Sequence, residues 1–238
     1  ASDVYKRQGF EGAIMLSAES ALKSGAGIIN IFCLSGNVQN ILEKRPEYMV
    51  LSKVDDLKKF LEKKITIIAG PGTTNYSRLN EILEIIYNDE TNLVLDAACI
   101  EIVKSKKFSS LPIITPHEGE AAKLLGINVD EISNKREYYA QKISDKFSVI
   151  TVLKGYETII TDGNEIYICK DGDSSLAFAG SGDILAGLIG SFLAQGAKRI
   201  DSCLLGVSLH AYSATNSKLK RGLTANELID LIRKNLNQ

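Results

Sequence analysis

Short, continuous apolar runs constrain the fold of this chain more than any other feature of its sequence. Such runs span residues 28–34, 65–69, 93–95, 112–115 and 149–153. A strand with one face in water alternates apolar and polar residues, whereas these runs do not, which is typical of parallel strands covered on both faces. Helical patterns separate the runs, so the sequence predicts an α/β domain with a mostly parallel central sheet and helices on both faces.

Two further patterns complete the predicted domain. Residues 158–161 and 165–169 flank the turn Asp162-Gly163-Asn164, which predicts a hairpin and an antiparallel edge of the sheet. Helical spacing predicts helices over 12–24, about 76–88, from about 118, 183–195 and 199–217. Small residues should let the first helix pack closely on the sheet. A last helix should begin at Thr224, with Glu227 completing a capping box.

The composition excludes several classes of function. The formal net charge is −1 over 238 residues, so no global basic field is present to hold a nucleic-acid backbone. No apolar run approaches the roughly 18 residues of a membrane span, and no secretory signal is visible. The cysteines lie far apart in apolar stretches, which predicts buried, reduced thiols at Cys33, Cys99, Cys169 and Cys203. We therefore expect a cytoplasmic protein that binds neither nucleic acid nor membrane.

Five segments are candidates for a ligand site. They are residues 70–72, 96–97, 115–120, 154–155 and 180–183, and the first four follow predicted strands, whose carboxyl ends carry ligands in open parallel sheets. Each has a structural alternative, since 70–72 could be a plain turn, Asp96 a helix cap and Lys154 a solvated surface residue. His117 follows Pro116 and is expected on a turn, whereas His210 lies within a helix and is more simply structural.

The segment Gly180-Ser181-Gly182-Asp183 is the most informative of the five. Glycines let a backbone approach a ligand, and the free N–H groups of the following helix make an anion site. An aspartate repels an anion, so Asp183 makes chemical sense there as a base that takes a proton from a hydroxyl while the N–H groups stabilise a phosphoryl group. The alternative is that Asp183 only complements the helix dipole.

Together the segments resemble the NAD(P)H-hydrate dehydratase family of the ribokinase-like superfamily. The resemblance runs from about Gly9 to the C-terminus and rests on GFEGA (9–13), SGAG (24–27), PEYM (46–49), AGPG (69–72), LDA (95–97), TPHEGE (115–120), VLKG (152–155), GSGDILAG (180–187), LAQG (193–196) and LHA (209–211). The GSGD motif occurs in many ribokinase-like kinases, whereas TPHEGE together with GPG and LKG in this order is more specific. The implied fold is a ribokinase-like three-layer sandwich.

The resemblance implies a repair lyase that restores NADH and NADPH from the S epimers of their hydrates, NADHX and NADPHX. ADP or ATP would phosphorylate the C6 hydroxyl, phosphate would then leave, and Mg²⁺ would be required. By position, Asp183 would be the catalytic base. Gly180, Ser181, Gly182, Lys154, Gly155 and Thr158 would surround the nucleotide phosphates, and Ala13, Gly72 and His117, with Asp183, would contact the hydrate. Expected partners are the hydrate, the adenine nucleotide, further copies in a homo-oligomer, and a fused or separate NAD(P)HX epimerase.

The chain departs from the family pattern in three places. Ala98 stands where a second aspartate is frequent, and Phe178-Ala179 precede GSGD where Thr-Gly is common. The family's opening strand is missing before Gly9, and residues 1–8 look like a non-native leader, so we expect a domain over 9–238 that lacks its first strand. Two other functions stay open: a small-molecule kinase such as a thiamine-precursor kinase, and a non-catalytic nucleotide-binding fragment.

Overall fold

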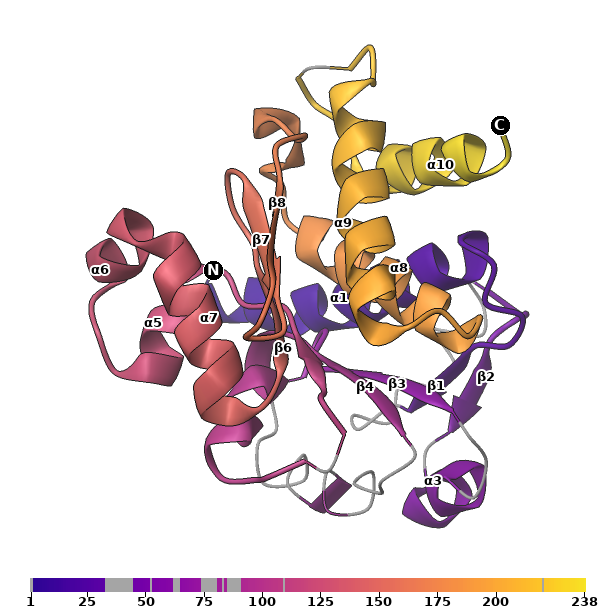
Figure 1. Cartoon of the computed structure of the whole chain (residues 1–238). Helices are drawn as coiled ribbons and strands as arrows, with labels where there is room; N and C mark the ends of the chain where they lie inside the picture. The colour runs from indigo at the N-terminus through magenta and orange to yellow at the C-terminus, as the bar shows by residue number, and fades with distance from the viewer. Residues whose placement is uncertain are drawn as a thin grey trace.

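A six-stranded sheet forms the centre of the molecule in a computed structural model, which describes residues 2–32, 45–51, 53–61, 65–73, 81–82, 84, 91–108, 110–219 and 221–238 (Figure 1). The strand order is β3-β4-β5-β6-β7-β8. The four parallel strands are β3 (Thr66–Ala69), β4 (Asn92–Leu95), β5 (Ile113–Ile114) and β6 (Ile150–Leu153). The hairpin of β7 (Thr158–Thr161) and β8 (Ile166–Cys169) adds the antiparallel edge, which confirms that prediction.

A second, two-stranded parallel sheet lies beside the first, and no described strand of it pairs with the first. It consists of β1 (Asn30–Phe32) and β2 (Met49–Leu51). The apolar run at 28–34 therefore does form a strand, although its last two residues lie outside the described part of the chain. The expectation of one sheet is wrong for β1, because among the described strands it pairs only with β2 and not with the central sheet.

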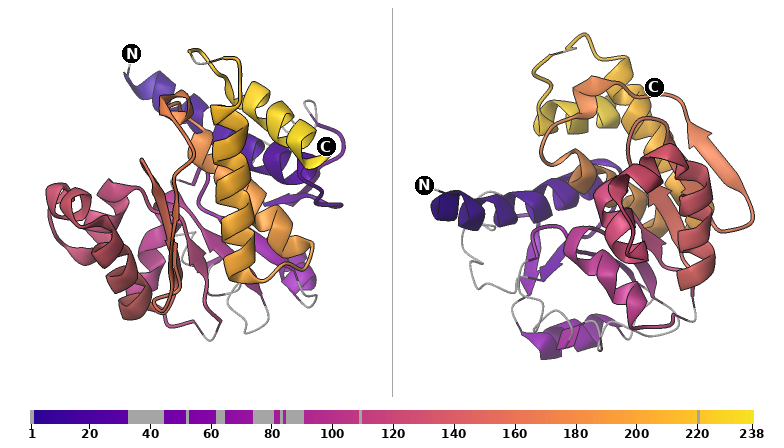
Figure 2. Two further views of the ribbon diagram at one scale, coloured as in Figure 1. Left: turned by 45° about the horizontal axis from the view of Figure 1, so that its top comes forward. Right: turned by 90° about the vertical axis from the view of Figure 1, so that its left-hand side faces the viewer.

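Helices cover both faces of the central sheet, as Figure 2 shows. Alternate side chains of one strand enter different cores: Leu95 packs with residues of η1 (Ala97–Lys104), α5 (Glu118–Leu125) and α7 (Arg136–Phe147), whereas Val94 packs with α8 (Ser181–Ala194) and α9 (Arg199–Thr215). The continuous apolar runs thus have the two-sided burial that they predicted. The remaining helical segments are α3 (Val54–Leu61), α6 (Val129–Asn134), η2 (Ser174–Leu176) and α10 (Ala225–Leu236).

Helix α1 spans Ser2–Lys23 and begins ten residues earlier than the sequence predicted. Residues 2–8 are helical in this structure and belong to neither sheet. The small residues of α1 face helix α8 rather than the sheet alone, since a Cβ on Gly187 would lie 2.2 Å from the Ser17 carbonyl oxygen, and Ser191 Oγ donates to Ala21 O at 3.0 Å. The sequence therefore identified the close packing but not its partner.

Other local predictions have mixed outcomes. The capping box of α10 is present, because the side chains and backbones of Thr224 and Glu227 bond reciprocally. Cys99 and Cys203 are buried, but Cys169 is only half-buried, since β8 is an edge strand with one face open; Cys33 lies outside the described residues. Most of the helix predicted over 76–88 lies outside them as well. Within the described ranges, no helix has the length and hydrophobicity to cross a membrane.

Candidate functional site

The candidate segments meet at one edge of the central sheet. Strands β3 to β6 are mutually parallel, so the residues that follow them share the carboxyl edge: the turn at 70–72, Asp96, the segment from Thr115 to His117, and Lys154. Backbone bonds continue past the strand ends, with Asp96 N–H donating to Ala69 O at 2.9 Å and Lys154 N–H donating to Pro116 O at 2.8 Å. The sheet therefore fixes these segments relative to one another.

Asp96 and Lys154 form an ion pair at this edge. Lys154 Nζ lies 2.8 Å from Asp96 Oδ1, which also accepts a 2.6 Å hydrogen bond from Thr115 Oγ1. The Asp96 side chain is buried and that of Lys154 is one-fifth exposed. Asp96 precedes η1 but makes no side-chain cap there, so the capping alternative is wrong. Its carboxylate instead orients the ammonium group of Lys154.

The loop before α8 has the backbone shape of an anion site. Gly180 has φ +101°, and helix α8 begins at Ser181, two residues earlier than predicted. Ile184 N–H donates to Gly180 O at 3.0 Å, and Ser181 N–H lies 3.4 Å from Phe178 O. No acceptor is found within the described residues for the N–H groups of Gly182 and Asp183. These two groups are the ones free to bind an anion.

Lys154 and Asp183 bring the sheet edge and this loop together. A Cβ built on Gly182 would lie 3.1 Å from Lys154 Nζ, so the glycine makes room for the ammonium group. Burial raises the pKa of Asp183 to about 6, with a further increase from the charge of Asp96 and an opposing effect from Lys154. A carboxyl group with this pKa is mostly ionised at neutral pH yet binds protons more readily than an exposed aspartate, as a general base requires.

His117 stands at the N-terminus of α5. Its Nδ1 accepts backbone hydrogen bonds from Gly119 and Glu120, at 3.0 and 3.3 Å, and Glu120 bonds back to the His117 N–H. The side chain is 62% exposed, which confirms the expectation of a turn rather than a core position. Because Nδ1 accepts, the neutral ring carries its proton on Nε2, which lies 3.7 Å from Glu120 Oε1.

Three further residues that the resemblance singled out lie on separate elements. Gly72 has φ +74° in the turn after β3, and Thr158 opens β7, where its hydroxyl donates to Gly155 O at 3.2 Å. Ala13 lies on α1, one turn before Leu16, whose Cδ1 would be 2.4 Å from a Cβ on Gly180. Helix α1 therefore reaches the loop before α8. Among the residues that the resemblance singled out, Lys154 lies against Gly182 and its charge acts on Asp183.

Arg136 is a residue of this region that the sequence analysis missed. Its guanidinium donates to three carbonyls of the loop after β6, those of Leu153 (3.2 Å), Lys154 (3.3 Å) and Tyr156. Its Nε lies 3.1 Å from the Glu118 carboxylate. A Cβ on Gly155, which has φ +143°, would lie 2.8 Å from Arg136 Nη2. Arg136 is the first residue of helix α7, and no local sequence motif indicated that it would hold a loop 17 residues away.

His210, on helix α9, contacts the first residue of helix α8. It lies buried in α9, with Nε2 3.1 Å from Ser181 O and 3.4 Å from Ser181 Oγ. Burial lowers its pKa to about 4, so the ring is neutral at physiological pH and Nε2–H donates to the Ser181 carbonyl. This agrees with a structural role.

Comparisons with known proteins give one consistent result. The family model described as NAD(P)H-hydrate dehydratase matches residues 7–235. The chain is 33% identical to the bifunctional NAD(P)H-hydrate repair enzyme of Vibrio cholerae, over 97% of this chain and 48% of that protein. It is 32% identical to the ADP-dependent (S)-NAD(P)H-hydrate dehydratase of Neisseria meningitidis, over 91% of this chain and 76% of that one.

Solved structures agree with the sequence relatives. The ADP/ATP-dependent NAD(P)H-hydrate dehydratase of Bacillus subtilis, co-crystallised with ATP/Mg²⁺, superposes with a TM-score of 0.82 at 27% identity, covering 94% of this chain and 83% of that chain. The chain thus spans about half the length of the bifunctional relatives and most of the length of the monofunctional ones.

Proposed function

We propose, from the premise that this chain belongs to the NAD(P)H-hydrate dehydratase family, that it restores NADH and NADPH from the S epimers of their hydrates at the expense of ADP or ATP. The observation that carries the proposal is the half-buried Asp183 carboxylate, beside the two free N–H groups that open α8 and the ammonium group of Lys154. A base and an anion site from the loop before α8, next to a cation from the loop after β6, are what phosphoryl transfer to a hydroxyl needs.

The first chemical step uses Asp183 as the base. Its carboxylate takes the proton of the hydrate's C6 hydroxyl, and the oxygen forms a bond to the terminal phosphorus of the nucleotide. The bond from that phosphorus to the bridging oxygen breaks, so ADP leaves as AMP, or ATP as ADP. The pKa of about 6 suits this task, because the group is ionised at neutral pH without being too weak a base.

The second step eliminates the phosphate. The nitrogen lone pair of the reduced ring expels phosphate from C6, and loss of the C5 proton then restores the C5–C6 double bond. Hydroxide is a poor leaving group and phosphate a good one, which explains why a phosphoryl-transfer site serves a dehydration. The balance is one hydrate and one nucleotide consumed for one reduced dinucleotide, one shorter nucleotide and one inorganic phosphate.

The remaining residues bind the two substrates. The N–H groups at Gly182 and Asp183, in the loop formed with Gly180 and Ser181, would stabilise the transferred phosphoryl group, with Lys154 neutralising the nucleotide's phosphates. Gly155 and Thr158 would line the same phosphates. Ala13, Gly72 and His117 would contact the hydrate, His117 through its exposed Nε2–H.

Magnesium fits this site as a companion of the nucleotide. Among the described residues, no group of three or more metal-ligating side chains is found. Mg²⁺ is usually held by one or two carboxylates together with substrate phosphates. Asp96 and Asp183, whose charges interact, are the carboxylates that would share it, and the ion would neutralise phosphate charge there.

The setting of the reaction is part of the same proposal. We propose a cytoplasmic enzyme that acts with an NAD(P)HX epimerase, fused or separate, and that assembles as a homo-oligomer. Support for the epimerase comes from the bifunctional relatives, which carry about as much sequence again as this chain matches.

The test follows the recovery of reduced-nicotinamide absorbance from synthetic hydrate, with ADP and ATP in parallel. Inorganic phosphate is measured in the same samples. We expect one phosphate per reduced dinucleotide formed, with no recovery when nucleotide is omitted. A stable phosphorylated alcohol without phosphate release would indicate a kinase instead, and nucleotide binding without any turnover would indicate a non-catalytic domain.

A further inference from the structure

The guanidinium group of Arg136 makes more contacts with one short loop than any local pattern required. Nη2 donates to Leu153 O at 3.2 Å and to Lys154 O at 3.3 Å, and Nη1 donates to Tyr156 O. Nε forms an ion pair with Glu118 at 3.1 Å, and the Arg136 side chain is only 15% exposed. Contacts of a cation that is mostly shielded from water are stronger than those of a solvated one.

These contacts set the direction of the peptide groups at the end of β6. In a trans peptide, the N–H group points opposite to the C=O group of the preceding residue. The carbonyl of Leu153 faces Arg136, and the next N–H, that of Lys154, accordingly donates to Pro116 O at 2.8 Å. The first peptide group held by Arg136 thus has its N–H turned toward the sheet edge.

The same geometry turns two further N–H groups away from Arg136. Because the carbonyls of Lys154 and Tyr156 face the guanidinium, the N–H groups of Gly155 and Glu157 point to the opposite side. For neither N–H is a protein acceptor found in the part of the chain that the structure describes. Neighbouring backbone N–H groups without protein partners are the donors with which turns bind anions.

The backbone of this loop needs outside support. Glu157 has φ +56°, a left-handed conformation that residues with side chains seldom adopt. Such a conformation persists only where the surroundings hold it. Gly155 has φ +143°, and a Cβ there would lie 2.8 Å from Arg136 Nη2, so the glycine lets the guanidinium approach the backbone. The three hydrogen bonds from Arg136 supply the support.

Arg136 is held in place by carboxylates. The second oxygen of Glu118 accepts from Ser133 Oγ at 2.6 Å, so Glu118 is fixed between Ser133 and Arg136. Burial lowers the pKa of Arg136, and the charges of Glu118 and Glu157 oppose that effect. Glu118 directly follows His117, so Arg136 connects the N-terminus of α5 with the loop after β6.

The packing of helix α7 does not depend on Arg136. The helix packs against β6 and β7 (Figure 1), and its buried residues are Ala140, Ile143 and Ser144. Arg136 is the first residue of the helix and lies outside this buried group. Replacing it should therefore alter the loop far more than the core.

We infer that Arg136 is a positioning residue for nucleotide binding, which orients the loop after β6 so that the N–H groups of Gly155 and Glu157 face the phosphates beside Lys154. The inference rests on the proposed function for the identity of the ligand. Arg136 touches neither substrate and acts through the loop, which lowers the cost of ordering donors when the nucleotide binds. A lysine could not replace it, because one ammonium group lacks the planar fork that contacts several carbonyls.

Steady-state kinetics separate positioning from a general structural role. Arg136→Met should raise the KM for ADP at least about tenfold, while kcat at saturating ADP stays within about threefold and the KM for hydrate within about twofold. Arg136→Lys should raise the KM for ADP by about threefold or more, and it also serves if the methionine variant is unstable. Arg199→Met is the matched control, since Arg199 also begins a helix but has no hydrogen bond to a loop among the described residues.

A ligand-free measurement tests the orientation of the loop itself. The chain contains no tryptophan, and the Tyr156 side chain is 79% exposed, so Tyr156→Trp introduces a single fluorescent reporter into the loop. Without ADP, we expect the fluorescence anisotropy of this reporter to fall clearly when Arg136→Met or Arg136→Lys is added, and to stay the same with Arg199→Met.

The two measurements distinguish failure of the inference from failure of the proposed function. A wild-type protein that does not bind ADP would overturn the proposed function together with the role of the loop. An active wild type with an unchanged KM for ADP in both Arg136 variants would overturn the inference alone. Unchanged reporter anisotropy in both variants, or an equal rise in the KM for ADP and the KM for hydrate, would overturn it as well.

Discussion

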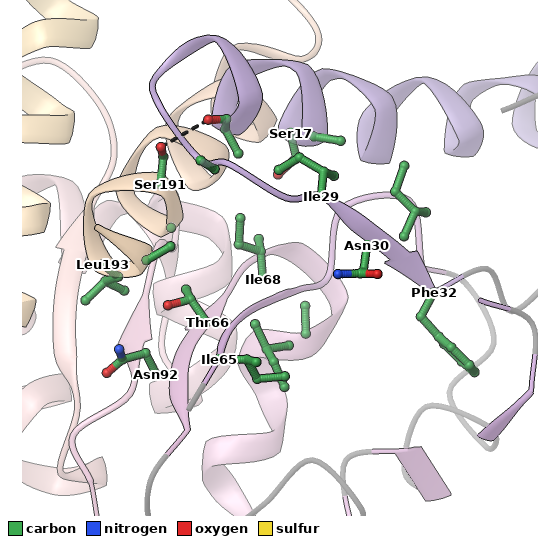
Figure 3. A pocket seen from close by; sticks show the side chains of 18 of the residues that line it. Ser17, Ile29, Asn30, Phe32, Ile65, Thr66, Ile68, Asn92, Ser191 and Leu193 are labelled. Atoms are coloured by element: carbon green, nitrogen blue, oxygen red, sulfur yellow. Dashed lines mark hydrogen bonds between the residues drawn. The ribbon is translucent and has the colours of Figure 1, made fainter. Parts of the chain in front are cut away.

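The two ends of the parallel sheet contain similar sequences but differ in burial. All four residues of β6 (Ile150–Leu153) are buried, whereas all four residues of β3 (Thr66–Ala69) are only partly buried. β6 has a strand on each side, while among the described strands β3 pairs with β4 alone and lines a cavity on its other side (Figure 3). The comparison indicates that the burial of a strand's residues depends here on its neighbouring strands more than on the hydrophobicity of its own residues.

The same contrast extends to the candidate site. At the β6 end, Arg136 holds the loop that carries Lys154, and Lys154 is paired with Asp96 beside the loop of Asp183. At the β3 end, the turn containing Gly72 lies next to the cavity that β3 lines. We therefore expect the half of the site proposed to bind nucleotide to be well ordered and the half proposed to bind hydrate to have less support.

The largest expected effect tests the chemistry at the supported end. Asp183→Asn should lower turnover by about 10²- to 10⁴-fold, because a carboxamide keeps the shape but cannot accept the proton. Asp201→Asn is the matched control, since Asp201 also occupies the first turn of a helix, α9, but is itself exposed. Recovery of reduced-nicotinamide absorbance is the measurement. More than a tenth of wild-type turnover in the Asp183 variant would exclude it as the base.

A smaller effect is expected for Lys154, the cation that we propose faces the phosphates. Lys154→Ala should weaken ADP binding by roughly 10- to 100-fold, the range of a lost charge-assisted hydrogen bond, and should change hydrate affinity less. The exposed Lys170 provides the control variant Lys170→Ala. Titration calorimetry with ADP measures both, and unchanged affinity in the Lys154 variant would contradict its assignment.

A modest effect on stability follows from the raised pKa of Asp183. Its pKa is about 6 in the folded chain against 3.8 for an ordinary aspartate, so the folded state binds the proton more tightly. That stabilising contribution is fully present below about pH 4 and is lost as the pH rises through about 6. Asp183→Asn should therefore melt a few degrees above wild type at pH 8 and show no gain at pH 4, by calorimetry. A gain that is independent of pH would contradict this origin.

Local sequence patterns predicted the six strands of the central sheet, because each of them forms a mostly apolar run, but they did not predict β2 (Met49–Leu51). They also placed His117 on a turn and Thr224 at a helix start, since caps depend on neighbours within four residues. The sequence could not identify the partner of Asp96, because Lys154 lies 58 residues away and only the parallel order of β4, β5 and β6 brings them together. Arg136 was missed for the same reason.

The strand pairing of β1 was also beyond local patterns. The run at 28–34 predicted a strand correctly, but whether that strand joins the central sheet depends on what fills the space beside it. Likewise, no strong sequence signal marks the start of α1 at Ser2. Gly9 destabilises a helix by only about 1 kcal/mol, and residues 2–8 contain no proline or glycine that would end it.

The pH dependence of turnover tests the central claim most directly, because that claim assigns the chemistry to Asp183 with its raised pKa. Absorbance recovery is measured from pH 5 to 8 with hydrate and ADP well below their KM values, for wild type and Asp183→Asn, because kcat/KM reports the pKa of the free enzyme. We predict that wild-type kcat/KM falls about tenfold per pH unit below about pH 6, while the residual activity of the variant lacks this inflection. A wild-type profile that is flat from pH 5 to 8, or the same inflection in both proteins, would contradict the account.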